Sequence, residues 1–307
     1  MYQCKGCGGE LAFNAHSGLL QCKYCNQEYN PYDITKESDG YQSDFFEATF
    51  FTCPQCGGQI YTTDTQTAGF CSYCGSSTVL SSRLDKGQKP DAIIPFKMTK
   101  EDCKDAYKKV MRKAIFAPKE LKDPKYIEEF RGIYMPYWKY LTYMDDSFNI
   151  KASKQYRQGD YIYTEHYQVT GEAEAWYKGF TYDSSTAFYD NISEPLAPFD
   201  ITEEKTFTPS FLSGFYAEME DVPVDLYLDD AIISTTDDII DNIAMQPEVK
   251  PYKIDKEKER RTLLPKCDVA ERMLFPVWFC PTARMIVWHM QQSMVRPGRW
   301  WQIFRWM

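Results

Sequence analysis

The sequence predicts an α+β fold in which two small cysteine-rich modules precede a larger domain of antiparallel strands and helices. One set of four cysteines occurs twice near the N-terminus. Farther along, aromatic and β-branched runs alternate as strands do, while other stretches carry apolar residues at helical spacing. With 307 residues, 43% of them hydrophobic, the chain is long enough for one sizeable domain besides the two modules.

The two cysteine sets share one spacing. Each reads C-x-x-C, fourteen residues, C-x-x-C, and the second copy follows the first by 49 residues. Two C-x-x-C pairs a hairpin apart bring four thiolates around one tetrahedral Zn²⁺, which supplies the folding energy that a short segment lacks. We therefore expect two zinc ribbons, each holding one Zn²⁺ ion. The expected ligands are Cys4, Cys7, Cys22 and Cys25 in the first ribbon and Cys53, Cys56, Cys71 and Cys74 in the second.

The residue after each C-x-x-C pair supports this interpretation. The backbone must turn back there so that both thiolates reach one ion, and this turn often needs a positive φ, which glycine and asparagine tolerate best. The four positions hold Gly8, Asn26, Gly57 and Gly75. All four turns therefore carry a suitable residue.

Other uses of paired cysteines fit less well. The N-terminus lacks the charged and apolar regions of a secretion signal, so a disulfide framework is not expected. A thioredoxin-like redox pair would lie in a βαβ unit, whereas here every pair has a partner pair. Redox sensing through zinc release stays open as an alternative.

The charge of the ribbon region favours a protein partner over nucleic acid. Residues 1 to 80 carry three cations and eight anions. Four thiolates around a divalent ion add a charge of about −2 per site. Because nucleic-acid binding depends on clustered Lys and Arg, this acidic region should repel a duplex. The net charge of the whole chain, −9, agrees with this expectation.

Composition also suggests where the domains begin and end. Polar, acidic residues separate the two cysteine sets, and a second polar stretch follows the second set. We expect the first ribbon at 1–30, a linker at 31–50, the second ribbon at 51–80, and a linker at 81–90. The α+β body should then span 91–279, followed by a tail of different composition at 280–307.

The body opens with a short apolar run at 92–96. Thr99, followed by Glu101 and Asp102, then marks the start of a helix that should run to about residue 115, with apolar residues on one face and lysines on the other. A second helical stretch is expected at 124–130, before Gly132. A third, at 225–244, places isoleucines at helical spacing among acidic residues.

Strands should fill most of the remaining body. Aromatic and β-branched residues alternate at 133–153 and 161–181, around a turn at 158–160 that contains Gly159. Two shorter strand-like stretches follow at 249–254 and 273–279. This succession of strands and helices predicts an antiparallel sheet of the α+β class.

Nothing in the sequence indicates catalysis. It contains no phosphate-binding glycine loop, no dinucleotide fingerprint, no H-E-x-x-H and no G-x-S-x-G motif. His16 falls in the loop of a ribbon whose four cysteines already complete a tetrahedron. His166 follows Glu165 in a strand, where neighbouring side chains point to opposite faces. Cys103, on the expected helix, is expected to be a packed residue and not a nucleophile.

Five segments of the chain form a recognisable series. They are YQCKGCGGEL at 2–11, CPQCGG at 53–58, IPFK at 94–97, GIYMPYW at 132–138 and FPVW at 275–278. In their sequence and order they resemble the bacterial proteins described as transcription-factor-IIB-type zinc-ribbon-containing, found in Firmicutes. The resemblance implies a zinc-binding protein, with a hydrophobic membrane segment after the body in intact relatives. Some members are labelled primosomal helicase-like, but this chain has no nucleotide-binding motor motif.

The tail at 280–307 departs from the family pattern. It is rich in arginine and tryptophan and has no acidic residue. One base missing near codon 279 would explain the change, because the neighbouring frame then encodes a continuation like that of the family. We therefore interpret the tail as a frameshift product. The alternative is an interfacial membrane anchor formed by its tryptophans and arginines.

Together these features predict a non-enzymatic zinc protein that acts as a protein-interaction or scaffolding module. It should be cytoplasmic, without a transmembrane segment in this chain, and membrane-anchored in full-length relatives. The partner is expected to be a protein. The alternative is a nucleic-acid-binding factor that uses the two ribbons, and a catalytic body domain is a third possibility.

Overall fold

The structure, a computed structural model, describes residues 2–34, 44–55, 57–63, 71, 81–113, 123, 127–128, 130–186, 201–280 and 285–288. The chain divides into two units. The first comprises Met1–Tyr137, Asp183–Val222 and Arg272–Met307, and the second comprises Trp138–Tyr182 and Pro223–Glu271. Two long strands, β8 (Arg131–Gln158) and β13 (Lys266–Cys280), contribute residues to both units. The described part of the chain consists mainly of mixed β-sheet with few helices, which confirms the predicted α+β class.

The N-terminal module is a small antiparallel sheet. It consists of β1 (Leu11–Asn14), β2 (Leu19–Cys22) and β3 (Glu28–Tyr29), with β2 in the middle. In β1, buried residues alternate with half-buried ones, as expected for a strand with one packed face. A short 3₁₀ helix, η1 (Pro31–Asp33), follows, and the side chain of Asn30 accepts a hydrogen bond from the Tyr32 amide at its start.

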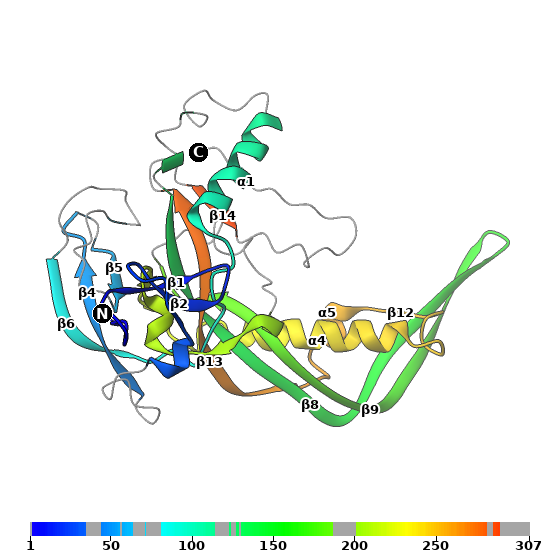
Figure 1. The fold of residues 1–307 in the computed structure, drawn as a ribbon. Coiled ribbons are helices and arrows are strands. Elements are labelled where there is room, and N and C mark those ends of the chain that lie inside the picture. The colour runs from blue at the N-terminus through cyan, green and yellow to red at the C-terminus, as the bar shows by residue number, and fades with distance from the viewer. Residues whose placement is uncertain are drawn as a thin grey trace. The chain divides into compact units, whose positions relative to one another are not determined.

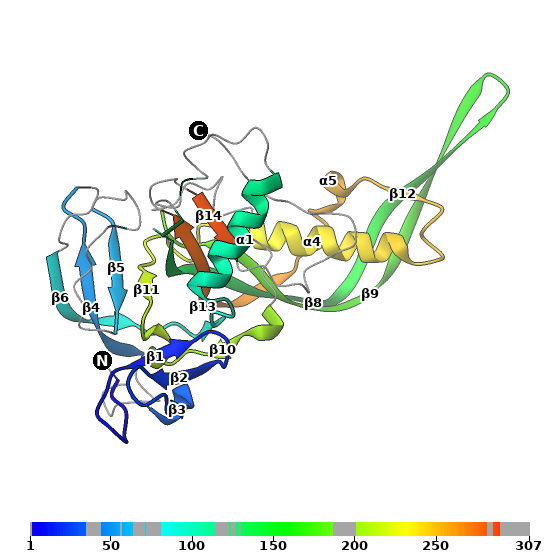
Figure 2. The same ribbon diagram turned by 45° about the horizontal axis from the view of Figure 1, so that its top comes forward.

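The second module contributes three antiparallel strands to the main sheet (Figure 2). β4 (Phe45–Thr52) lies between β5 (Gln59–Thr62) and β6 (Ser81–Gln88) and pairs with both. This arrangement corrects two expected linkers. The stretch 81–90 is mainly strand β6, and the stretch 31–50 already contains η1 and the start of β4; residues 35–43 lie outside the described part.

The main sheet of the first unit has the strand order β10-β7-β13-β8-β11-β5-β4-β6, and β14 (Met285–Trp288) pairs with β13. The short strands are β7 (Ala92–Ile93), β10 (Lys205–Thr206) and β11 (Tyr216–Glu218). β11 runs parallel to β8 and antiparallel to β5. Two 3₁₀ helices, η5 (Ile201–Glu203) and η6 (Pro209–Leu212), precede β11. The strand expected at 273–279 is confirmed as part of β13.

Helix α1 (Lys100–Lys113) confirms the helix expected after Thr99. The Asp102 carboxylate accepts hydrogen bonds from the Thr99 amide and hydroxyl, at 2.8 and 2.6 Å. The Asp102 amide in turn donates to the Thr99 hydroxyl at 3.3 Å. This reciprocal arrangement is a capping box, with aspartate in place of the usual glutamate.

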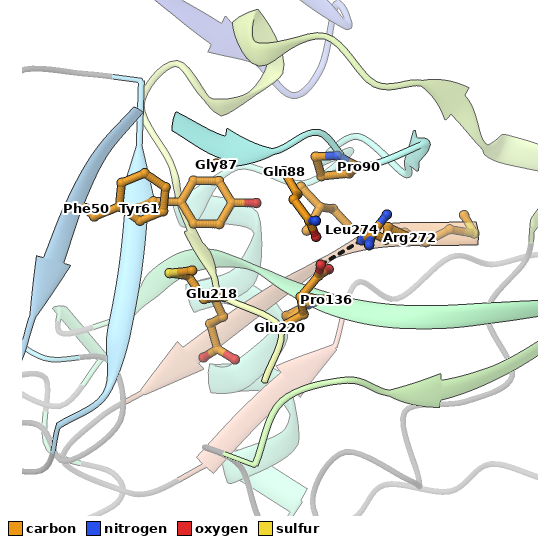
Figure 3. A pocket seen from close by; sticks show the side chains of 12 residues that line it. Phe50, Tyr61, Gly87, Gln88, Pro90, Pro136, Glu218, Glu220, Arg272 and Leu274 are labelled. Carbon is orange, nitrogen blue, oxygen red and sulfur yellow. Dashed lines mark hydrogen bonds and ion pairs between the residues drawn. The ribbon is translucent and has the colours of Figure 1, made fainter. Parts of the chain in front are cut away.

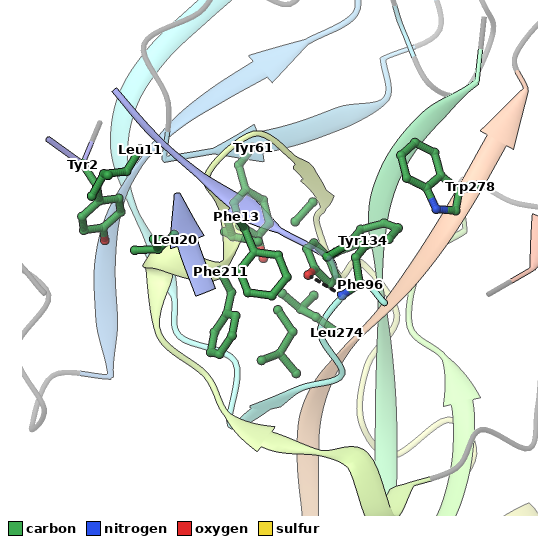
Figure 4. Close-up of a cluster of buried hydrophobic side chains, with 14 of the residues drawn as sticks. Tyr2, Leu11, Phe13, Leu20, Tyr61, Phe96, Tyr134, Phe211, Leu274 and Trp278 are labelled. Atoms are coloured by element: carbon green, nitrogen blue, oxygen red, sulfur yellow. Dashed lines mark hydrogen bonds between the residues drawn. The ribbon is translucent and has the colours of Figure 1, made fainter. Parts of the chain in front are cut away.

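The first unit has a continuous aromatic core (Figure 4). Phe96 stacks on Phe215 with ring centroids 4.2 Å apart, and its amide donates to the Tyr134 hydroxyl at 3.3 Å. On the other side of the cluster, Phe13 of β1 packs edge-on against Phe211 of η6, with ring centroids 5.4 Å apart. Residues of the N-terminal module therefore belong to the same core as the central strands.

The second unit is built on the long hairpin of β8 and β9 (Tyr161–Asp183), with α4 (Leu228–Met245) along it (Figure 1). Gly159, with φ +61°, occupies the two-residue turn between the strands. Ile239, Ile240 and Ile243 of α4 are buried in a core with Met144 and Ile150 of β8. The hairpin and this helix confirm the predicted elements.

The remainder of the second unit differs from expectation. Of the strand expected at 249–254, only β12 (Lys253–Ile254) forms, and it pairs with β8. Val249 instead lies in a turn closed on Gln246, and the short helix α5 (Lys256–Glu259) follows β12. Valine at this position is buried, so its apolar character reflects packing and not strand formation.

Some expectations fall outside the described part of the chain. Most of the helix expected at 124–130 and all of the tail except Cys280 and β14 belong there. The interpretation of the tail as a frameshift product therefore stays a prediction. Among the helices that the structure describes, none is long and apolar enough to cross a membrane.

Candidate metal centre

The structure brings the four cysteines of the first ribbon together. The sulfur atoms of Cys4, Cys7, Cys22 and Cys25 all lie within 4.8 Å of one another. The Sγ–Sγ distance is 3.6 Å between Cys4 and Cys25. The Cys7 sulfur lies 3.5 Å from the sulfurs of both Cys22 and Cys25. In a tetrahedral site with Zn–S bonds of about 2.3 Å, neighbouring sulfurs lie about 3.8 Å apart. This group could therefore hold a metal ion of that geometry.

The backbone of both turns explains how the sulfurs converge. After the first pair, the Gly8 amide donates to the Cys4 carbonyl at 2.9 Å; after the second, the Asn26 amide donates to the Cys22 carbonyl at 3.1 Å. Gly8 has φ +73° and Asn26 has φ +58°. These are left-handed conformations that glycine and asparagine adopt most readily. The sequence argument for these two turns is confirmed.

The surroundings of the sulfurs favour the thiolate form at two of the four positions. The Tyr29 hydroxyl lies 3.2 Å from the Cys4 sulfur, and this hydrogen bond is the main reason why the pKa of Cys4 is lowered to about 6. Backbone hydrogen bonds from Cys25 and, at 3.5 Å, from the Tyr24 amide lower the pKa of Cys22. Hydrogen-bond donors aimed at sulfurs in this way would orient the sulfurs toward a metal ion.

The described residues around Cys53 have the same backbone geometry as those around Cys4. The Gly57 amide donates to the Cys53 carbonyl at 2.9 Å, and Gly57 has φ +77°, close to the values at Gly8. The Cys53 amide donates to the Gly58 carbonyl at 3.0 Å, as the Cys4 amide does to Gly9 at 2.8 Å. Cys53 and Cys71 are both buried, like Cys4 and Cys22. Cys56, Cys74 and the turn at Gly75 lie outside the described residues.

One face of the first ribbon packs on the body, which sequence reasoning missed. The Phe13 amide donates to the Ser213 carbonyl at 3.0 Å, and the Ser210 hydroxyl donates to the Pro31 carbonyl at 2.8 Å. Phe211 is fully buried between Phe13 and Tyr32. Residues 205–215 carried no signal for this contact, because they are separated from the ribbon by most of the chain.

The opposite face of the ribbon is exposed. We call it the knuckle surface, consisting of residues 5–8 and 23–28, all of which are exposed. Tyr24 is its most prominent side chain, with 79% of its surface exposed. Lys23 is paired with Glu10 at 2.7 Å, and the Lys5 ammonium donates to the Asp33 carbonyl. The surface therefore presents an aromatic ring beside the cysteine site, without a cluster of cations.

The other candidate residues do not join the cysteine site. The His16 ring nitrogen lies 2.7 Å from the Asp102 carboxylate at the start of α1, so His16 connects the ribbon to that helix. His166 is exposed on β9, and Cys103 is fully buried in α1. Among the described residues, the first cysteine set is the one group of three or more potential ligands that converges.

Comparison with known proteins adds little to this geometry. No family model and no solved structure matches the chain. The chain is similar to YdjG, an uncharacterised protein of Bacillus subtilis strain 168, with 29% identity over 221 residues. The match covers 71% of this chain and 65% of the Bacillus protein, so the chain spans less than two thirds of that relative's length.

Proposed function

We propose that this chain is a zinc-binding protein-interaction module in which each of two Cys4 ribbons holds one Zn²⁺ ion. The sulfur distances in the first ribbon support the tetrahedral site, and the turn at Gly57 supports a second site built in the same way. The eight ligands would be those expected from the duplicated spacing. Zinc would act structurally, because four thiolates leave no open coordination position for a substrate.

The exposed knuckle surface is the observation that favours an interaction role. One face of the first ribbon is buried against Phe211, whereas the other presents Tyr24 at 79% exposure. Tyrosine is enriched at protein interfaces because its ring is large and amphipathic and has few rotatable bonds. The acidic charge of the ribbon region disfavours nucleic acid as the partner. A protein that covers Tyr24 is thus the favoured partner.

Quantitative affinity capture from cells tests this role. The expected result is a specific set of proteins that binds the natural chain and is lost with Tyr24→Ala, while the zinc content of the variant is unchanged. Tyr161→Ala, which truncates a tyrosine that is 72% exposed and lies outside the ribbons, is the matched control. Nuclease treatment should leave the bound set intact.

Two results would contradict the proposal. An identical set of proteins with both variants would remove the knuckle surface from the interaction. Binding of random DNA that weakens steeply with salt would support the nucleic-acid alternative instead.

A further inference from the structure

The main sheet of the first unit curls until strands from its two ends meet. Next to β4, the Lys89 amide donates to the Asp44 carbonyl at 2.8 Å. Two residues later, the Asp91 amide donates to the Arg272 carbonyl of β13 at 2.9 Å. In the strand order, however, β8, β11 and β5 separate β13 from β4. Because two residues span only about 7 Å, the sheet must bend to bring these strands so close, and it therefore has an enclosed inner face.

The strand register shows which residues lie on this inner face. Tyr61 of β5 pairs with Phe50 of β4 and with Ala217 of β11, and all three are buried in the aromatic core. Since successive side chains alternate between the faces of a strand, Met219 shares the inner face and Glu218 lies on the outer one. Burial raises the pKa of Glu218 well above its usual value, and its carboxyl group points away from the inner face (Figure 3).

The inner face borders a cavity of about 250 Å³, and all the residues that line it belong to the first unit. A closed apolar cavity of about 150 Å³ is large enough for benzene. The present cavity therefore has room for a single ring with a short substituent. Apolar residues form most of its wall: Phe50, Gly87, Pro90, Pro136, Met219 and Leu274.

The Tyr61 hydroxyl brings a polar atom to this apolar wall. Tyr61 is 6% exposed, and burial raises the pKa of its hydroxyl well above the usual value, so the group keeps its proton. Within the described part of the chain, no group accepts a hydrogen bond from it. The hydroxyl points into the space between Gln88 and the Glu220–Arg272 pair (Figure 3). A buried donor without a partner is costly, so this one calls for a ligand.

The charged groups of the cavity lie on its solvent side. The Arg272 Nε lies 2.6 Å from a Glu220 carboxylate oxygen, and the two side chains are 32% and 25% exposed. This ion pair is neutral as a whole, so it favours neither a cation nor an anion. The buried part of the wall offers the Tyr61 donor and apolar surface. A charged ligand would lose its hydration there without gaining a counter-charge.

We propose that this cavity binds a neutral, mainly apolar molecule of about the size of one ring that carries a carbonyl group, and that Tyr61 donates a hydrogen bond to the carbonyl oxygen. The apolar part of the ligand would pack on Phe50 and Leu274. Water alone fits less well, because a buried water needs two to four polar partners and this wall is apolar. The site is separate from the cysteine cluster and adds small-molecule recognition to the proposed function.

Methionine-methyl NMR of the zinc-loaded natural chain tests the proposal, because Met219 lines the cavity. Acetophenone should shift the Met219 methyl resonance in a saturable way. It should leave the resonance of Met144, in the core of the second unit, unchanged. Benzoate and benzylamine, which have the same ring but carry a charge, should bind at least 10-fold more weakly. Absence of a saturable shift at Met219 with acetophenone, or equal or tighter binding of either ion, would overturn the proposal.

Tyr61→Phe supplies the matched test on the protein side, since it removes only the hydroxyl. The variant should bind acetophenone roughly 5- to 30-fold more weakly. It should bind α-methylstyrene, in which a CH₂ group replaces the carbonyl oxygen, as the natural chain does. Tyr161→Phe, which removes an exposed hydroxyl in the second unit, should leave the affinity for both compounds unchanged.

Full acetophenone affinity in Tyr61→Phe, or an equal loss of affinity for both compounds, would overturn the role of the hydroxyl. The variant should unfold at the same urea concentration as the natural chain or at a higher one, because the hydroxyl has no partner within the described part of the chain. If the variant does not fold, the comparison of acetophenone with the two ions on the natural chain still decides the proposal.

Discussion

Gly8, Asn26 and Gly57 each hold a positive φ directly after a C-x-x-C pair. At Gly8 and Gly57, no described residue beyond the chain neighbours has an atom within 4 Å of the position that a Cβ would occupy, so the backbone conformation and not space demands glycine. The residue type at these positions was therefore predictable from the sequence, because few residues other than glycine and asparagine adopt the tight turn that follows a C-x-x-C pair.

Gly8→Ala should destabilise the first ribbon by about 1–2 kcal/mol, the cost of placing a Cβ in the left-handed conformation. Gly57→Ala should have a similar effect on the second ribbon if the two modules are true copies. Urea unfolding of the zinc-loaded protein measures both changes. A neutral Gly57→Ala beside a destabilising Gly8→Ala would argue against equivalent ribbons.

Tyr29→Phe should weaken metal binding in the first ribbon roughly 10- to 100-fold, because it removes the donor that lies 3.2 Å from the Cys4 sulfur. Competition with a chromophoric zinc chelator measures the change. Tyr24→Phe, which alters an exposed hydroxyl on the same ribbon, is the control and should bind zinc as the natural chain does. Equal zinc affinity in both variants would show that the Tyr29 hydroxyl does not support the site.

Sequence reasoning identified the four cysteines that converge in the first ribbon but missed Tyr29 and the buried Glu218. The cysteines share a spacing that few folds other than metal ribbons use. Tyr29 is one of 23 tyrosines and Glu218 one of 44 acidic residues, and neither has a distinctive neighbour. What makes each of them chemically unusual is a partner or an environment formed by segments distant in the sequence.

A strand or helix was predictable where its own residues have the hydrophobic periodicity of that element. Aromatic and β-branched residues alternate along β8 and β9, and isoleucines recur at helical spacing along α4. These three elements form where they were expected. The polar segment of β6, SSRLDKGQ, has no such pattern, and its composition predicts a linker. It is the last strand in the order and, among the described strands, pairs with β4 alone; edge strands commonly carry charged residues. Its strand conformation is thus imposed by β4.

The contact of the first ribbon with η6 makes the ribbon dependent on the body. Phe211→Ala should lower the free energy of unfolding by about 3–5 kcal/mol, because the ring is fully buried between Phe13 and Tyr32. The variant should also release zinc from the first ribbon faster. Chemical denaturation and zinc transfer to a chelator measure the two effects.

Tyr24→Ala is the matched control for Phe211→Ala, since it truncates an aromatic residue that is 79% exposed. It should change stability by only about 0.5 kcal/mol. If Phe211→Ala left both stability and zinc release unchanged, the ribbon would behave as an independent module joined by a linker, as the sequence alone suggested.

At the scale of the whole molecule, both cysteine-rich modules belong to the first unit, while the β8–β9 hairpin and α4 form the second. A domain boundary was expected near residue 90, but residues on both sides of that position belong to the first unit. Core residues of the N-terminal module, such as Leu11 and Leu20, share one cluster with Phe207 and Phe211. Metal binding should accordingly stabilise more of the chain than the ribbons themselves.

Metal removal should loosen the first unit selectively. After chelation, hydrogen exchange should rise in β1 and β2 and also in residues 205–215, which pack on the ribbon. Exchange in the core of the second unit, including α4, should stay near its metal-loaded value because that core has its own hydrophobic cluster. Mass spectrometry of exchanged peptides checks this pattern. A rise confined to residues 2–34 would mean that the ribbon does not support the body.

The zinc content of the purified chain tests the central claim most directly. Elemental analysis by mass spectrometry, at a protein concentration known from amino-acid analysis, should give two zinc ions per chain. Replacing Cys4 and Cys7 by serine should reduce the content to one, as should replacing Cys53 and Cys56. X-ray absorption should show four sulfur ligands at about 2.3 Å around each ion. A natural chain that holds no zinc, or the loss of both ions after either double replacement with the fold intact, would contradict two independent Cys4 sites.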